Sequence, residues 1–119
     1  MRVHELMPKF AELLSMFSSL EVLCLAMDCN FDAARDQIFP AIATNTYLPA
    51  LSKLELHTMP LNEHDLVTFL SRHKDTIKHA IVPAFARLGL IGLSHDVVER
   101  IGRTMAERDI KVKIELGEA

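Results

Sequence analysis

The sequence predicts an α/β fold, in which short parallel strands form one sheet and helices pack on a single face of it. Three observations lead to this prediction. Leucines in residues 51–61 follow a strand-and-turn pattern that runs directly into a capped helix. Weaker copies of the pattern begin at Leu20 and Ile77. The best-formed strands are polar on one side, which indicates a sheet with one face in water.

The spacing of the predicted strands favours parallel pairing. They begin at Leu20, Leu51, Ile77 and Ile110, which are 26 to 33 residues apart. Each interval holds a helix or has room for one. Parallel neighbours need a connection of about a dozen residues or more, usually helical. A sheet covered on both faces would instead have central strands that are apolar on both sides.

The N-terminal part is predicted to form a helix and then a strand. Pro8 suits the first position of a helix, and apolar residues recur at helical spacing after it. These residues are Phe10, Leu13, Leu14 and Phe17. The first strand follows at Leu20–Leu25, and Phe31 lies where a later core residue of the repeat is expected.

Residues 32–47 carry a conflicting pattern. Asp32 is a suitable cap for a helix, but Pro40 falls inside that helix and is expected to break or kink it. The alternative is a loop as far as Phe39, with Pro40 opening a short helix. We favour the broken helix.

The second repeat is the clearest. Leu51, Leu54 and Leu56 point to one face of the predicted strand. The opposite face carries Lys53, Glu55 and His57.

The helix after this strand has signals at both of its ends. Asn62 is a favourable N-cap, and acidic residues occupy the first turn, where the helix dipole favours them. Its apolar stripe is Leu66, Val67, Phe69 and Leu70. Arg72, His73 and Lys74 occupy the C-terminal end, which favours cations.

The third repeat begins with a strand at Ile77–Val82, and Pro83 interrupts the connection that follows. Residues 83–93 contain two glycines and are predicted to be irregular. Ser94 caps an amphipathic helix, and Ile110–Leu116 alternates apolar and charged residues. This alternation predicts a last strand with one face buried and one in water.

Composition limits the partners that the chain can have. Apolar residues make up 50% and charged residues 24% of the 119 residues, the balance of one folded domain. The net charge is −3 and no basic block is present, so we expect no nucleic-acid binding. No apolar run approaches the roughly 20 residues that span a bilayer, so we expect no membrane insertion.

Cysteine usage favours an intracellular protein, in the cytoplasm or the nucleus. Two cysteines, Cys24 and Cys29, make no disulfide framework, and we expect reduced and mostly buried thiols. Glu5, Lys9 and Glu12 fall where the apolar region of a signal peptide would have to lie.

No group of residues in the sequence predicts an enzyme, a cofactor or a metal site. The histidines at 57, 64, 73 and 79 match no zinc-binding spacing. Ser94-His95-Asp96 is contiguous, whereas the members of a catalytic triad converge from separate places. The pair Gly89 and Gly92 lacks the third glycine of a dinucleotide-binding loop.

The run Leu48–Leu56, followed by Asp65–Ile77, resembles the leucine-rich-repeat region of fungal F-box-type proteins. Residues 51–61 fit the repeat consensus, with Met59 where Asn or Cys is usual. The resemblance implies a short solenoid of about three to four strand–helix units, similar to ribonuclease-inhibitor-like repeats. Residues 1–119 would form one such domain, either by itself or as a piece of a longer array.

The resemblance also implies a surface that reads a partner, as in the substrate-reading part of a ubiquitin-ligase adaptor. No F-box-like segment is recognisable at the N-terminus. We therefore predict a non-enzymatic protein-interaction module whose partner is another protein. The open last strand offers an edge for self-association. The predicted partner-binding residues are Val22, Cys24, Lys53, Glu55, His57, His79 and Lys113.

The sequence leaves two alternatives open. One is a compact α/β domain of an enzyme or small-molecule binder, with helices on both faces of the sheet. The other is an incomplete gene product. In the first alternative the polar side of the second strand would be covered, whereas in the repeat fold it would be exposed.

Overall fold

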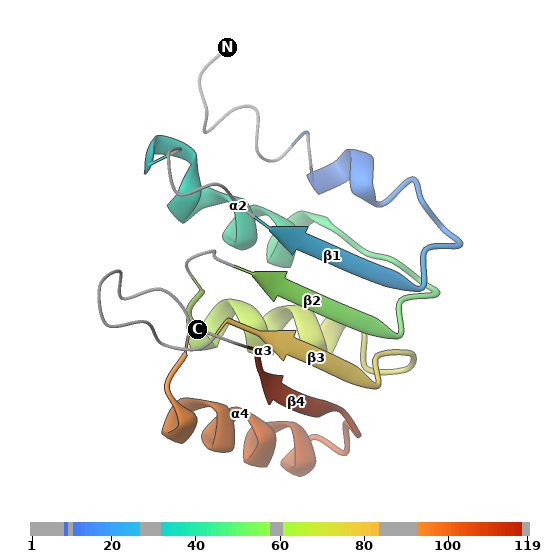
Figure 1. Cartoon of the computed structure of the whole chain (residues 1–119). Coiled ribbons are helices and arrows are strands. Elements are labelled where there is room, and N and C mark those ends of the chain that lie inside the picture. The colour runs from blue at the N-terminus through green and yellow to red at the C-terminus, as the bar shows by residue number, and fades with distance from the viewer. Residues whose placement is uncertain (1–8, 10, 27–31, 58–60, 84–92, 118–119) are drawn as a thin grey trace.

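The chain is an α/β protein with a four-stranded parallel sheet, seen in a computed structural model (Figure 1). The structure describes residues 9, 11–26, 32–57, 61–83 and 93–117. The strands are β1 (Val22–Ala26), β2 (Lys53–His57), β3 (His79–Val82) and β4 (Lys113–Leu116). The intervening helices are α2 (Asp32–Asn45), α3 (Glu63–Arg72) and α4 (His95–Glu107). This confirms the predicted α/β class and the parallel sheet.

The strands lie in the sheet in the order in which they occur in the chain, β1-β2-β3-β4, and the sheet is open. Right-handed crossovers between sequential parallel strands place the connecting helices on the same face. Figure 1 shows α2, α3 and α4 together on one side, where α2 contacts α3 and α3 contacts α4. The shortest dimension of the molecule is 19 Å. Packed layers lie about 10 Å apart, so this thickness corresponds to two layers.

The hydrophobic core lies between the sheet and these helices. Leu54, Leu56 and Ala80 are completely buried, whereas the residues between them along their strands are partly exposed. The strand residues meet fully buried side chains of the helices. Those side chains are Phe39, Ile42, Leu66, Phe69, Leu70 and Ile101.

The predicted caps of α3 and α4 are confirmed. Asn62 Oδ1 accepts a hydrogen bond of 2.8 Å from the Asp65 N–H, and Asn62 Nδ2 donates one of 2.7 Å to the Asp65 carboxylate. Ser94 Oγ accepts from the Val97 N–H at 3.4 Å. The bonds from the Asp65 and Val97 N–H groups each satisfy a backbone donor that has no partner inside its helix.

The prediction of a broken helix in residues 32–47 is wrong. α2 is one helix of 14 residues with Pro40 inside it. A proline in a helix interior removes one backbone hydrogen bond and costs about 3 kcal/mol. Tertiary packing outweighs that cost, since Phe39, Ile42 and Ala43 on either side of Pro40 are completely buried.

The last strand begins at Lys113, later than the predicted Ile110. The intervening residues complete the end of α4. Asp109 has a φ of 59°, and its N–H donates to Ala106 O at 3.0 Å. The Ile110 N–H donates to Met105 O at 2.9 Å. This is a Schellman cap, with Asp109 in the left-handed position that usually holds glycine.

Some predictions fall outside the described residues, namely those on Glu5, Pro8, Phe10, Cys29, Phe31, Met59 and the glycines at 89 and 92. Pro83 directly follows β3 and is buried, and its carbonyl accepts a hydrogen bond of 2.9 Å from the Leu93 N–H. None of the helices in the described part of the chain is long and apolar enough to cross a bilayer.

Candidate functional site

The face of the sheet opposite the helices forms the candidate site, and we call it the open face. It carries alternate residues of the four strands, because successive side chains of a strand point to opposite faces. All seven predicted partner-binding residues lie on it. With two further positions its members are Val22, Cys24, Lys53, Glu55, His57, His79, Ile81, Lys113 and Glu115. None of these nine side chains is buried.

The pairing register arranges these residues in rows across the sheet. One row reads Val22, Lys53, His79 and Lys113 from β1 to β4. The next row reads Cys24, Glu55, Ile81 and Glu115. Neighbouring strands lie about 4.8 Å apart, so each side chain is within reach of its neighbours in both rows.

Glu115 is the centre of one polar group, the Glu115 cluster, formed with His79 and Lys113. His79 Nε2 lies 2.9 Å from Glu115 Oε2, and Lys113 Nζ lies 2.9 Å from Glu115 Oε1. Hydrogen bonds from Lys113 and then from His79 hold the pKa of the Glu115 carboxyl below its ordinary value. Both oxygens of this carboxylate are therefore engaged, one by Lys113 and one by His79.

A second group, the Cys24 cluster, joins β1 and β2. One donor atom each from Cys24, Glu55 and His57 lies within 4.8 Å of the other two. Glu55 Oε1 is 3.6 Å from His57 Nε2. The Cys24 thiol is free and exposed, so the expectation of a buried thiol is wrong for Cys24. The reason is the register, which places Cys24 on the open face.

The convergence of the Cys24 cluster was not predicted. The sequence placed all three residues on one face, but metal motifs are recognised by spacing along the chain, and Cys24 and Glu55 are 31 residues apart. Only the register of β1 against β2 sets Cys24 opposite Glu55.

Exposed apolar side chains occur near the N-terminus. Residues 11–14 form a short helical segment that attaches to the end of α2, where Thr46 Oγ1 donates to Ala11 O at 2.7 Å. Leu13, Met16 and Phe17 are 58%, 75% and 59% exposed. The predicted apolar stripe of this segment is therefore only partly buried.

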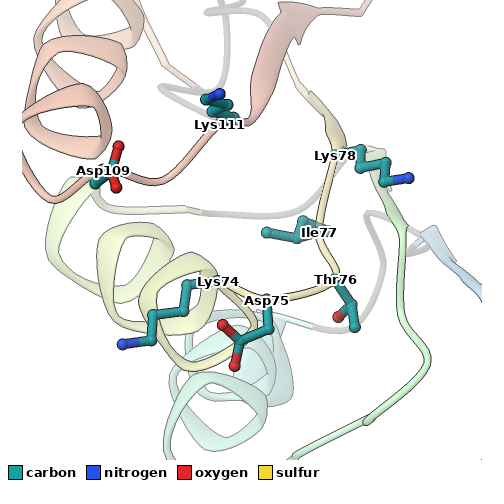
Figure 2. A pocket seen from close by; sticks show the side chains of 7 residues that line it. All are labelled: Lys74, Asp75, Thr76, Ile77, Lys78, Asp109 and Lys111. Carbon is teal, nitrogen blue, oxygen red and sulfur yellow. The ribbon is translucent and has the colours of Figure 1, made fainter.

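A hollow of roughly 530 Å³ lies before β3 and β4 and is lined by Lys74, Asp75, Thr76, Ile77, Lys78, Asp109 and Lys111. Figure 2 shows that Ile77 points into the hollow, whereas the charged ends of Lys74 and Lys78 point away from it. A ligand site needs a few polar groups that converge. The charged ends of these two lysines therefore do not converge on a ligand in the hollow.

His73 is buried, although the sequence placed it among the cations at the end of α3. The Leu48 N–H donates to His73 Nε2 at 3.0 Å, and His73 Nδ1 lies 2.8 Å from Phe69 O. Nδ1 therefore carries the proton and the ring is neutral. Burial is the largest cause that lowers the pKa of His73. Both ring nitrogens are engaged within the fold, so His73 has a structural role.

The open face, with its two polar clusters, is the feature from which a function can be inferred. Comparisons with protein-family models, with curated proteins and with solved structures find no match for this chain.

Proposed function

We propose that this chain is a non-enzymatic protein-interaction module that binds a partner protein through the open face. One observation carries the proposal. The nine open-face side chains run across all four strands, and none of them is buried. In the described ranges, the helices that cover the sheet lie on its other face (Figure 1).

The chemistry of the open face suits a protein better than a small molecule. Cations, carboxylates, histidines and apolar side chains alternate over it, and complementary charges of this kind provide specificity between proteins. Ile81 lies between Glu55 and Glu115 in its row and supplies an apolar centre. The Glu115 carboxylate is already oriented by Lys113 and His79, so little of its motion has to be lost on binding.

We also propose that the strand–helix units are leucine-rich repeats. Strand order is the main support. In a doubly wound sheet the order of the strands reverses at a switch point, whereas here it runs from β1 to β4 in one direction. The buried leucines of β2 support it as well. On this proposal the open face is the surface with which a repeat array reads its partner. A substrate-reading role in a ubiquitin-ligase adaptor is part of the same proposal, as is self-association through the free edge of β4.

The test is affinity capture from a lysate of the source organism with quantitative mass spectrometry. Three forms of the chain serve as bait. They are the wild type, an open-face variant (Lys53→Ala, Glu55→Ala, His57→Ala) and a matched helix-face variant (His95→Ala, Glu99→Ala, Arg103→Ala). The control removes the same kinds of side chain from exposed positions of α4.

We expect at least one protein to be captured by the wild type and by the helix-face variant, and to be depleted about tenfold or more with the open-face variant. Loss of about 1.4 kcal/mol of binding free energy is enough for that change. Equal recovery of every captured protein by the wild-type and open-face baits would refute the proposal.

A further inference from the structure

We propose that the Cys24 cluster is a Zn²⁺ site, in which the ion is held by the Cys24 thiolate, the Glu55 carboxylate and the His57 imidazole. The three residues come from adjacent strands and lie on the open face. The inference does not depend on the proposed partner binding, because the metal is bound by side chains of this chain alone.

The distances fit a tetrahedral ion. Zinc bonds of about 2.0–2.1 Å to nitrogen or oxygen and about 2.3 Å to sulfur put neighbouring donor atoms about 3.3–3.6 Å apart. Glu55 Oε1 and His57 Nε2 are already 3.6 Å apart. The remaining pairs lie within 4.8 Å. Cys24 is exposed, so its side chain is free of packing that would prevent rotation toward the other two donors.

The donor types point to zinc among the common ions. Thiolate and imidazole are poor ligands for Mg²⁺ and Ca²⁺, which prefer oxygen donors. Cysteine, histidine and carboxylate are the three side-chain types that bind Zn²⁺ in proteins. Three protein ligands leave the fourth tetrahedral position to a water molecule.

A nucleophilic role for Cys24 fits the geometry less well. In a thiol–imidazole–carboxylate triad, the thiol and the carboxylate engage different nitrogens of the ring. Here the thiol and the carboxylate both approach a single ring nitrogen of His57. Three donor atoms that converge in this way suit a metal ion better than a catalytic relay.

The Glu115 cluster provides a matched control on the same face. His79 is also a strand histidine beside a glutamate, but Lys113 occupies the other oxygen of that glutamate. The cluster contains no cysteine, and its glutamate is neutralised by lysine. His79→Gln is therefore expected to leave zinc binding unchanged.

The test uses the purified, metal-free chain kept reduced without added thiols, and Zn²⁺ is titrated in competition with a chromogenic chelator. We expect one Zn²⁺ whose affinity falls at least about tenfold in Cys24→Ser and in His57→Gln, with no change in His79→Gln. Co²⁺ in place of Zn²⁺ is expected to give a thiolate-to-metal charge-transfer band that is absent from Cys24→Ser. On the wild-type chain, Zn²⁺ is expected to slow alkylation of Cys24. Peptide mass spectrometry measures the rate of this alkylation.

Three results would overturn the assignment. The first is an equal Zn²⁺ affinity of the wild type, Cys24→Ser and His57→Gln. The second is a charge-transfer band that persists in Cys24→Ser, since another residue would then be the sulfur ligand. The third is an alkylation rate of Cys24 that Zn²⁺ leaves unchanged, a measurement that needs no variant and no partner. The capture experiment is a separate test, because it measures recovery of a partner protein and not metal binding, although its open-face variant removes two of the three zinc ligands.

Discussion

Two single residues show how packing decides protonation and backbone conformation in this chain. His73 follows α3 in the sequence, yet its ring is stacked on Phe69 with centroids 4.2 Å apart and accepts a hydrogen bond from the Leu48 N–H. The ring therefore ties the C-terminal end of α3 to the connection that precedes β2. Asp109 takes a left-handed backbone conformation that permits the cap of α4.

The first prediction concerns the pH dependence of stability through His73. Burial lowers the pKa of His73 in the folded chain, whereas the unfolded chain has the ordinary value of about 6.5. The unfolded state therefore binds the proton more readily, and acid favours unfolding. The contribution of His73 to the stability of the folded chain is complete above about pH 6.5. It is lost as the pH falls through the lowered pKa of His73 in the folded state. We expect the free energy of unfolding, measured with urea, to decrease over that range.

The matched variants are His73→Gln and His95→Gln. His95 has a side chain that is 77% exposed and serves as the control. His73→Gln is expected to flatten the pH dependence, and His95→Gln to retain it. An undiminished pH dependence in His73→Gln would mean that another group is responsible.

The second prediction concerns the backbone of Asp109. A side chain with a Cβ in the left-handed region costs about 1 kcal/mol, which glycine avoids. Asp109→Gly is therefore expected to raise the free energy of unfolding by about 0.5–1 kcal/mol. Asp109→Ala is expected to lower it, because alanine keeps the Cβ and loses the polar side chain that tolerates this region. Chemical denaturation of the three forms checks the order, and a less stable glycine variant would contradict it.

At the scale of elements, most of the fold could be predicted from local signals. β2 shows the two-residue alternation, with Leu54 and Leu56 buried and Lys53, Glu55 and His57 partly exposed. α3 has its cap, its acidic first turn and its apolar stripe at the predicted places. In these segments local preference and tertiary packing agree, so the sequence alone is sufficient to predict their structure.

Where the prediction failed, tertiary contacts or register outweighed the local signal. α2 stays intact across Pro40 because buried residues on both sides of it hold the helix against the core. The Cys24 cluster depends on the pairing of β1 with β2, and His73 depends on its partners at Leu48 and Phe69. A single sequence carries no local signal for such long-range contacts.

The third prediction concerns the cap of α3. Asn62 accepts from the Asp65 N–H at 2.8 Å and also contacts its carboxylate. Asn62→Ala is expected to lower the free energy of unfolding by about 1 kcal/mol. Ser94→Ala is expected to cost less, since the corresponding bond at α4 is longer, 3.4 Å. Denaturation curves of the two variants measure how much unfolding free energy each one loses. An equal loss, or a larger loss in Ser94→Ala, would contradict the prediction.

At the scale of the whole molecule, the two faces of the sheet differ in what they contribute to stability. One face buries the leucines against the helices, and the other presents polar side chains that contribute little to the core. This separation underlies the proposed function, because the open face can change its chemistry without loss of the fold.

The fourth prediction tests this separation. Leu54 is completely buried, so Leu54→Ala is expected to cost about 2–5 kcal/mol of unfolding free energy. Ile81→Ser on the neighbouring strand is expected to cost less, because Ile81 is only partly buried and lies on the open face. Comparable losses at the two positions would show that the open face is covered in solution.

Photo-cross-linking is the most direct test of the claim that the open face binds a partner protein. A photoreactive amino acid is placed at position 81, in the centre of the open face, and separately at position 103, on the exposed side of α4. The two forms are irradiated in the same lysate. The proposal predicts a specific cross-linked protein from position 81 that is absent from position 103. A specific product from position 103 alone would contradict it.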